Sequence, residues 1–483
     1  MALRNGDSYK RSLQQLRPNV HKWGRVVEDV TTDPATRLHV QSVAASFDAA
    51  FDEVRAPYFT TTSALSGQRA HRWNTLLRGA EDVLGNALMK REQFRWTGTC
   101  QGATCAGWTA LNALWAVTHE TDAERGTDYH ARLREYFRFV EDTAPALAGA
   151  LTDAKGDRAL RASRQPSPDA YLHVSEVRPD GIVVRGVKAQ ICAVAAANEI
   201  VVVPGTAHGE AEKEHAVAFA VPRDVAGLTI VETRRPSDTR DEEEGWDAPK
   251  AGGITQAWLL FDDVFVPRNR VFLCGEHTAT GKFVAIFSAI YRAAIGACVA
   301  GQGDVMIGAA LALARANGLG QKTFQEKLTQ MAVNSEVTFS VGVGAMFLGR
   351  NHPSGLFIPD PLLAHVNKVQ VGRLPYETKV LAQDISGGVA ETGCLPSFKD
   401  FGSPAYGEAL LTAAGGAVDG ETRARLARLV EWLTIGGGVP GCMHGGGSPD
   451  GAKLAIKGLV DWERRVDDAR RIAGVTRPLA ESR

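Results

Sequence analysis

The sequence carries almost no net charge and lacks the common nucleotide-binding fingerprints. Its 54 basic and 55 acidic residues give a formal net charge of -1. Proteins that bind nucleic acids or membrane surfaces usually carry a basic excess, so neither class is indicated. No Gly-x-Gly-x-x-Gly follows a predicted strand, and a Walker loop and a Gly-x-Ser-x-Gly are both absent. A classical nucleotide-binding fold is therefore unsupported.

Signals for secretion and membrane insertion are also missing. We find no apolar run of the roughly 20 residues that a membrane span needs. The opening residues, MALRNGDSYKRSLQQL, contain no apolar signal-peptide core. The seven cysteines are odd in number, scattered, and without zinc-type pairing, so a disulfide framework is not indicated. These features predict a cytoplasmic protein.

The pattern along the chain predicts three units, as expected for 483 residues of which 44% are hydrophobic. Residues 1–150 show helical periodicity, including a stretch at 110–119 that is apolar on most sides. Residues 151–278 contain short β-branched runs separated by Gly, Pro and Asp, with a hairpin signal at Asp180-Gly181 and an acidic surface loop at 236–253. Residues 279–483 return to long helices, one of them at 359–385. We therefore predict an α+β fold.

A polar run after the first helical unit is a candidate cofactor site, because cofactors often bind between domains. The run TDAKGDR contains Thr152, Lys155, Asp157 and Arg158, whose amides and charges could hold a phosphate or a flavin edge. The alternative is an ordinary capped surface loop. We also assign Gln190 to the cofactor site.

Two Gly-rich segments could let the backbone approach a cofactor closely. Ser386, Gly387 and Gly388 form the first, and MHGGGSP near the C-terminus forms the second. His444 in the second segment could act as an acid or base. The alternative is a flexible turn with a satisfied histidine.

Three cysteines are candidates for a soft-metal or iron–sulfur site. Cys100 and Cys105 precede the buried 110–119 stretch, and Cys298 lies within an apolar helix. Clustered thiolates bind soft metals and iron–sulfur clusters. The alternative is that they pack as small hydrophobic residues.

Several motifs, in order along nearly the whole chain, resemble one known family. They are RNGDSYKRSL, TDAKGDR, DGIVVRG, FDDVFVPRNRVFLCGE, GQGDVMIGAA, ISGG and MHGGGSP. The sequence is identified as a member of the family joining 4-hydroxyphenylacetate 3-hydroxylase to 4-hydroxybutyryl-CoA dehydratase. The resemblance implies an acyl-CoA-dehydrogenase-like fold with an N-terminal helical domain, a central antiparallel β-barrel and a C-terminal four-helix bundle. It also implies FAD and a homotetramer.

The sequence motifs most resemble those of the dehydratase branch, whose members hold a four-iron four-sulfur cluster with three cysteines and one histidine. By resemblance, two of these cysteines fall on Cys105 and Cys298. The third falls on Gln101, next to Cys100, and the histidine falls on Tyr291.

The acid–base groups of both branches are replaced. By resemblance, the dehydratase tyrosine falls on Ile295, and its two glutamates fall on Gln256 and Gly441. The phenol-binding arginine and tyrosine of the hydroxylase fall near Ala106 and Ala110. Its histidine falls near Gly149, so small residues here predict a wider pocket.

The leading prediction is an FAD-dependent monooxygenase that uses FADH2 from a separate flavin reductase, and O2, on a small-molecule substrate. This substrate would be larger than, or different from, a simple phenol, with His444 and Tyr291 as catalytic candidates and no iron–sulfur cluster. The alternative is a dehydratase-like lyase or isomerase on an acyl-CoA, using FAD and a cluster held by Cys100, Cys105 and Cys298. A flavoprotein that has lost catalysis is a third possibility. In each case the three cysteines are expected to lie close together.

Overall fold

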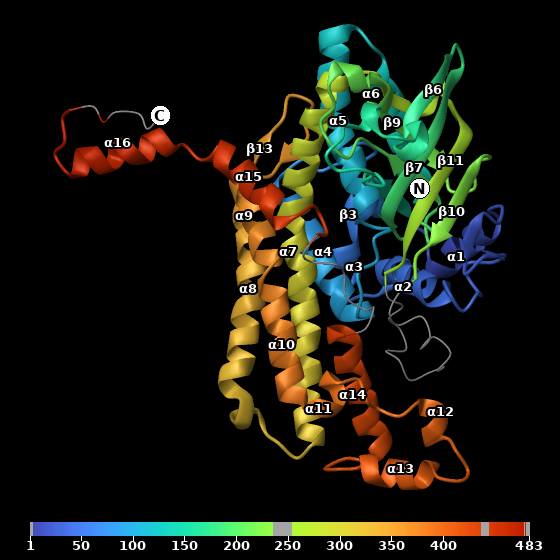
Figure 1. Ribbon diagram of the computed structural model, residues 1–483, viewed down its shortest axis with the longest axis vertical. Coiled ribbons are helices and arrows are strands. Elements are labelled where there is room, and N and C mark those ends of the chain that lie inside the picture. The colour runs from blue at the N-terminus through green and yellow to red at the C-terminus, as the bar shows by residue number, and fades with distance from the viewer. Residues whose placement is uncertain (1–2, 235–253, 436–443, 478, 480–483) are drawn as a thin grey trace.

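The computed structural model describes residues 3–234, 254–435, 444–477 and 479. The predicted acidic loop at 236–253 lies outside these residues. Figure 1 shows a mixed α+β molecule in which an elongated set of helices lies beside two β-sheets near its upper end.

The first 150 residues form helices and short strands. They are α1 (Gly6–Gln14), β1 (Val20–Lys22), β2 (Arg25–Val27), α2 (Arg37–Asp48), α3 (Ala56–Phe59), β3 (Thr60–Thr62), β4 (Arg69–His71), α4 (Ala80–Thr97), α5 (Ala106–Arg125), α6 (Tyr129–Thr143) and β5 (Leu147–Ala150). Helix α5 is buried at every position from 107 to 118, which confirms the buried helix predicted at 110–119.

The central part of the chain supplies most of the sheets. Its strands are β6 (His173–Arg178), β7 (Gly181–Cys192), β8 (Glu199–Val202), β9 (Val217–Pro222), β10 (Leu228–Glu232), β11 (Gln256–Pro267) and β12 (Val271–Cys274). Strands β6 and β7 pair antiparallel with Arg178 opposite Gly181, which confirms the predicted hairpin.

The strand pairings of the described residues do not show the antiparallel β-barrel that the resemblance implies. The strands of the described residues form two large sheets, in the orders β2-β1-β10-β11-β7-β6 and β12-β9-β8-β5, and two small pairs, β3-β4 and β13-β14. Two pairings are parallel, β1 with β10 and β5 with β8, because strands from the first 150 residues join each sheet. The six-stranded sheet thus binds the N-terminal part of the chain to the central part.

The last third of the chain is helical. Its elements are α7 (His277–Ala316), α8 (Gln325–Phe347), β13 (Arg350–Asn351), β14 (Phe357–Ile358), α9 (Pro361–Val371), α10 (Leu374–Ser386), α11 (Gly388–Glu391), α12 (Phe398–Phe401), α13 (Gly407–Ala414), α14 (Gly420–Thr434), α15 (Pro449–Leu459) and α16 (Trp462–Ile472). The helix predicted at 359–385 is divided, because Pro375 begins a new helix in the first turn of α10.

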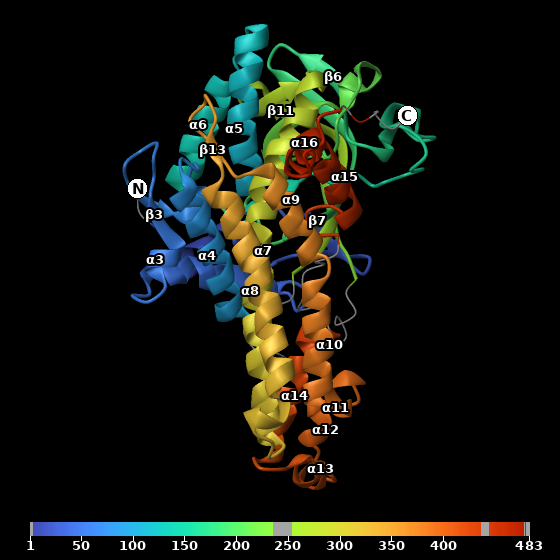
Figure 2. The ribbon, with the colours of Figure 1, turned by 90° about the vertical axis from the view of Figure 1, so that its left-hand side faces the viewer.

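Helix α7 is the central helix of this region and packs against α8, α9, α10 and α14. Figures 1 and 2 show α7, α8 and α10 running side by side, with α14 beside their lower part. Two glycines set the close approach of α7 and α8: a Cβ at Gly296 would overlap the carbonyl of Thr338, and one at Gly342 would overlap that of Ala293. Helix α16 projects away from the rest of the chain and has no buried residue.

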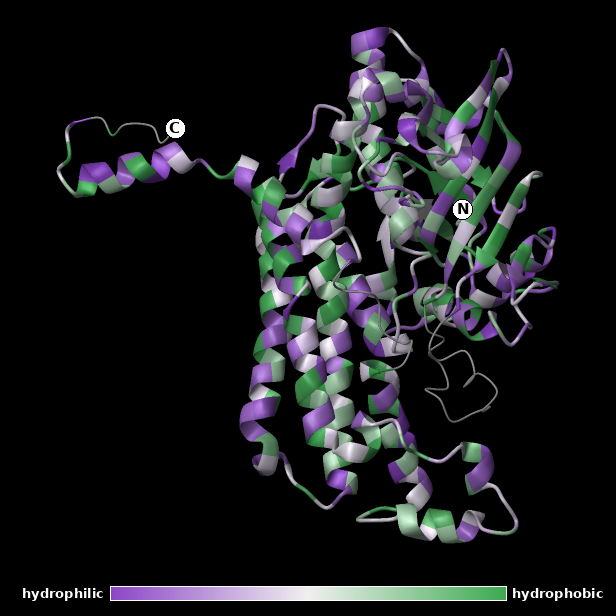
Figure 3. Cartoon of the chain, in the orientation of Figure 1, coloured by the Kyte–Doolittle hydropathy of each residue, from purple (hydrophilic) through white to green (hydrophobic). Residues whose placement is uncertain are grey.

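The sequence predicted no apolar run long enough to span a membrane, but helix α7 meets that criterion. By length and composition α7 could cross a membrane, with a mean hydropathy of 1.9 in its most apolar window. In the structure, 61% of that window is buried within the chain. Figure 3 shows apolar residues recurring along the helices that pack around it, as expected for a core helix.

Candidate functional site

Four cysteines gather where the α4–α5 loop, strand β7 and helix α7 meet. Cys100 lies in the loop, Cys105 immediately precedes α5, Cys192 ends β7, and Cys298 lies midway along α7. All four are free thiols and are half-buried. A Cβ at Gly102, between the two loop cysteines, would lie 3.1 Å from the Cβ of Cys192. The loop therefore lies directly against the end of the strand.

Tyr291 lies close enough to all four cysteines for charge on their sulfurs to affect its pKa. It lies two turns before Cys298 on α7, and its ring stacks on Phe287 with centroids 5.4 Å apart. Burial raises the pKa of Tyr291 well above its usual value, and negative charge on the four cysteines would raise it further. The Lys90 ammonium lies 5.5 Å from the centre of the same ring. At neutral pH Tyr291 is thus a neutral phenol.

The thiols differ in acidity. A hydrogen bond with Cys298, assisted by the nearby Lys90 charge, lowers the pKa of Cys100 to about 7 despite its burial. The same hydrogen bond, together with burial, raises the pKa of Cys298. Burial raises the pKa of Cys105, and that of Cys192 to about 12. Cys100 is therefore the thiol that most readily becomes a thiolate.

A buried amide network holds the cysteine loop in place. Gln101 accepts hydrogen bonds from Ser46 Oγ, at 2.6 Å, and from Gln93, and it donates to the carbonyl of Ser42. Gln93 also bonds Thr104 Oγ at 3.0 Å. The Gln101 side chain therefore binds α2 and α4, while the neighbouring Cys100 meets Cys298. Cys100, rather than Gln101, is thus the loop residue whose side chain faces α7.

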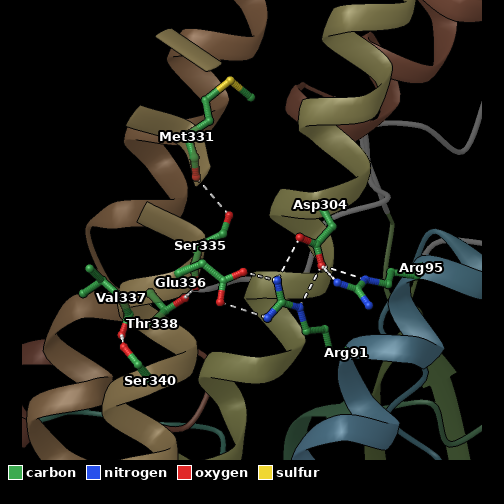
Figure 4. A network of polar contacts seen from close by, with 9 residues as sticks. All are labelled: Arg91, Arg95, Asp304, Met331, Ser335, Glu336, Val337, Thr338 and Ser340. Atoms are coloured by element: carbon green, nitrogen blue, oxygen red, sulfur yellow. Dashed lines mark hydrogen bonds and ion pairs between the residues drawn. The ribbon is translucent and has the colours of Figure 1, made fainter. Parts of the chain in front are cut away.

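An ion-pair network fixes α4, which carries Lys90, against α7 and α8 (Figure 4). The Arg91 guanidinium bonds both carboxylate oxygens of Asp304, at 2.8 and 3.0 Å, and also Glu336. Arg95 bonds the same Asp304 at 2.7 Å. Helices α4 and α7 can approach closely because Gly301 has no side chain. A Cβ at that position would lie only 2.5 Å from the Arg91 carbonyl oxygen. This network sets the position of Lys90 relative to the cysteines.

The C-terminal Gly-rich segment reaches the same site. A Cβ at Gly446 would lie 2.9 Å from the Tyr291 ring, so the bare backbone lies on that ring. Arg292 donates to the Gly446 carbonyl at 2.9 Å, and Lys368 donates to the Gly445 carbonyl at 2.6 Å. His444 itself is exposed. The structure thus brings the segment of one catalytic candidate, His444, onto the other, Tyr291.

The polar run at 152–158 lies at the edge of the sheets. The Thr152 carbonyl accepts a hydrogen bond of 2.9 Å from the Ala189 N–H. This bond places the run beside β7 and near the exposed Gln190. Within the run, Asp153 forms a largely buried ion pair of 2.7 Å with Lys188 of β7. The side chains at 155, 157 and 158 are exposed. These groups are open to a ligand.

Ser386, Gly387 and Gly388 lie elsewhere, at the α10–α11 junction. Figures 1 and 2 place this junction toward the lower end of the molecule, far from the β-sheets. The buried Ser386 hydroxyl has no hydrogen-bond partner among the described residues, and a Cβ at Gly387 or Gly388 would meet nothing within 4 Å. Within one chain, the two predicted flavin-binding segments are not brought together.

The positions at which the resemblance expects acid–base groups are apolar or amide. Gln256 donates to Cys192 Sγ at 3.7 Å, and the Ile295 side chain would lie 3.8 Å from a Cβ at Gly446. Gly441 is outside the described residues. At Gly149 the backbone of Ala106 fills the space that a side chain would take, so the glycine itself leaves no open space at that point.

Sequence reasoning missed two members of this site. Cys192 ends a regular strand pattern, and Lys90 sits among other charged residues of α4, so neither stands out locally. Both reach the site through the packing of distant elements. Within the described part of the chain, no three His, Cys, Asp or Glu residues are arranged to hold a single metal ion.

Comparison with known proteins gives a family for the whole chain. The family model described as 4-hydroxyphenylacetate 3-hydroxylase N terminal matches residues 5–273, and the C-terminal model matches residues 280–474. The 4-hydroxybutyryl-CoA dehydratase/vinylacetyl-CoA-Delta-isomerase of Clostridium aminobutyricum is 34% identical over 98% of this chain and 100% of the relative. A 4-hydroxyphenylacetate 3-monooxygenase oxygenase component of Thermus thermophilus is 27% identical, covering 90% of this chain and 89% of the relative.

Solved structures agree. An oxygen-tolerant archaeal 4-hydroxybutyryl-CoA dehydratase from N. maritimus has a TM-score of 0.95 at 33% identity, covering 100% of this chain and 97% of that one. The oxygenase component HpaB of 4-hydroxyphenylacetate 3-monooxygenase, complexed with FAD, has a TM-score of 0.81 at 23% identity, covering 97% of this chain and 98% of that one. The chain therefore belongs to the 4-hydroxyphenylacetate 3-hydroxylase family, which includes both monooxygenase oxygenase components and 4-hydroxybutyryl-CoA dehydratase.

Proposed function

We propose that this protein is an FAD-dependent lyase or isomerase that acts on an acyl-CoA thioester with the help of an iron–sulfur cluster. The observation that carries the proposal is the set of thiols around Tyr291. Cys298, which is distant in sequence, joins Cys100 and Cys105 at one place beside a buried cation, Lys90. End-to-end similarity to a dehydratase/isomerase supports the same branch. The proposal replaces monooxygenation as the leading function.

The donor set suits a cluster in its chemistry. Iron–sulfur clusters are bound by cysteine thiolates, and here the thiols are half-buried and free of disulfides. The lack of a single-ion arrangement among the described residues is compatible with a cluster, because each thiolate of a cluster binds a different iron. When bound, such a cluster supplies a Lewis-acidic iron or an electron carrier next to the substrate.

The segments assigned to FAD fit a shared site. The Ser386 hydroxyl, unpartnered within the described residues, and the open space at Gly387 and Gly388 provide one half, and the exposed groups at 152–158 provide the other. Because one chain does not bring these halves together, the proposal places them on different protomers of the expected homotetramer. FAD supplies the redox chemistry, and the protein positions it.

The chain's own residues would act on the acyl-CoA from the Tyr291 side. The neutral Tyr291 phenol can donate a hydrogen bond or a proton, since its pKa is raised by burial. Lys90 places a positive charge beside the ring, where it stabilises negative charge that develops on a substrate. The Gly446 backbone covers the ring from the C-terminal side.

The test is an assay of anaerobically purified protein with both reactions named for the relative. We expect turnover of 4-hydroxybutyryl-CoA or vinylacetyl-CoA by protein that contains iron and FAD. Fully loaded protein that converts neither thioester, nor any close acyl-CoA homologue, contradicts the proposal. Iron-free protein also contradicts it.

Monooxygenation is the second candidate, and the observation that favours it is the loss of acid–base groups. Gln256 and Ile295 cannot transfer the protons that dehydration of an unactivated chain requires. Hydroxylation with FADH2 and O2 depends less on such groups, since the cofactor carries most of the chemistry. This function would need a separate flavin reductase. Oxygen-dependent hydroxylation of a phenol by iron-free protein supplied with FADH2 would establish it, and about four irons per chain would exclude it.

A further inference from the structure

We infer that Cys192 is the fourth thiolate ligand of the iron–sulfur cluster, completing an all-cysteine set with Cys100, Cys105 and Cys298. The inference rests on the proposed function and names the ligand that replaces the histidine expected at Tyr291.

The position of Cys192 supports this role. It is the last residue of β7, and the loop that carries Cys100 and Cys105 packs on it, with the Gly102 Cβ position 3.1 Å from the Cys192 Cβ. A side chain at Gly102 would also crowd Ala193, so this loop reaches the strand only because position 102 is glycine. The strand end therefore brings a thiol to the two loop cysteines.

A hydrogen bond from a neighbouring strand orients the Cys192 sulfur. Gln256, on the paired strand β11, donates its amide to Cys192 Sγ at 3.7 Å. Hydrogen bonds to ligand sulfurs orient them and tune the potential of a cluster. The Cys192 side chain is half-buried, as are those of the other three cysteines.

Tyr291 is poorly suited to ligate in place of the histidine. Its oxygen is a hard donor, whereas iron–sulfur clusters take thiolates and, less often, imidazole. Its ring is fixed between Phe287 and the Gly446 backbone. Loss of the histidine and the presence of a cysteine at 192 thus compensate for each other, and the donor count stays at four.

The experiment measures iron, acid-labile sulfide and visible absorption in full-length protein purified and reconstituted anaerobically. The variants are Cys192→Ser, the double variant Cys192→Ser with Tyr291→His, and Cys274→Ser as the matched control. Cys274 is also a half-buried free thiol, but it lies on β12, outside the site. Circular dichroism and flavin content report whether each variant remains folded.

We expect about four irons per chain in the wild type and in Cys274→Ser, and fewer than about one in Cys192→Ser. The double variant should regain at least about half of the iron, because imidazole is an accepted cluster ligand and is smaller than the phenol it replaces. Its electron paramagnetic resonance spectrum after reduction should differ from that of the wild type.

The outcomes separate this inference from the proposed function. Wild-type protein that takes up no iron overturns both. Wild-type protein with a cluster that Cys192→Ser fully retains overturns only the assignment of Cys192. Failure of a folded double variant to regain iron also overturns it, because the loss in Cys192→Ser would then reflect general damage to the site.

Discussion

The thiols of Cys100 and Cys298 share a hydrogen bond, although one lies in the α4–α5 loop and the other midway along α7. The contact exists only while α4 and its following loop are packed on α7. The same packing places Lys90 beside the thiols and beside the Tyr291 ring. The geometry of the site thus depends on what holds α4 in position.

Arg91→Ala should destabilise the protein and disturb the site. Arg91 is largely buried and bonds two carboxylates, Asp304 and Glu336, so its removal leaves a partly buried negative charge with fewer partners. We expect a loss of about 2–4 kcal/mol in the free energy of unfolding, measured by chemical denaturation. Arg95→Ala is the matched control and should cost less than about 1 kcal/mol, because Arg95 is nearly half exposed. Equal effects of the two changes would contradict this role for Arg91.

His71 should make the protein less stable as the pH falls below 6.5. Burial lowers the pKa of His71 to about 3, while its Nε2 contacts the backbone of Arg4. The neutral ring is favoured in the folded state, so stability is full above the unfolded pKa of about 6.5 and is lost as the pH falls toward 3. Between pH 7 and pH 5 this one group should cost about 2 kcal/mol.

The measurement is the free energy of unfolding of wild type and His71→Gln at pH 5, 6 and 7. The variant is expected to be less stable at pH 7, because the ring packs between Phe47 and Trp73. Its stability should nevertheless fall less steeply with decreasing pH. Parallel pH profiles for the two proteins would show that His71 does not contribute.

Local patterns predicted which parts of the chain are helical or extended, but the pairing of those parts depends on contacts that no local pattern contains. The buried helix around Leu114 was predictable because its apolar residues occupy every face. The parallel pairing of β5 with β8 was not, because it joins two units that look separate along the sequence. The resemblance implied a central β-barrel, whereas strands from the first 150 residues join both large sheets of the structure.

The candidate site was predictable only where its residues share a segment or a recognisable motif. Cys100 and Cys105 were singled out by their place just before a buried helix, Cys298 by its place in an apolar helix, and Cys105 and Cys298 also by resemblance. The direction of the Gln101 side chain follows from partners on α2 and α4 that the sequence does not identify. At Gly149 the absence of a side chain suggested space, whereas the structure shows that the backbone of α5 uses it.

Gly388→Leu should weaken FAD binding while leaving the fold intact. A Cβ at Gly388 meets no atom of the described chain within 4 Å, so the larger side chain can crowd only a ligand or a partner protomer. Gly387 is less suitable for this test, because its φ of 77° strains any other residue. We expect at least a tenfold rise in the dissociation constant for FAD, measured by fluorescence titration.

The matched control for that change is Gly458→Leu. Gly458 lies in α15, and a Cβ there also meets nothing within 4 Å among the described residues. Its substitution should leave FAD affinity unchanged. If Gly388→Leu binds FAD as tightly as the wild type, the α10–α11 junction is not part of the flavin site.

Tyr291→Phe should lower kcat and leave cofactor content unchanged. The change keeps the ring that stacks on Phe287 and lies beneath Lys90, and it removes only the hydroxyl that we propose as donor to the acyl-CoA. Loss of a general acid typically costs about 100-fold or more in rate, so we expect a fall of that order in kcat with little change in KM. The control is Tyr406→Phe. Tyr406 is exposed, donates a hydrogen bond to Asp400, and is not part of the cysteine site, so this variant should behave as wild type. Because iron and flavin are measured in the same samples, a loss of cofactor in Tyr291→Phe would indicate a structural role instead. A fully loaded variant with wild-type kcat would remove Tyr291 from the catalytic groups.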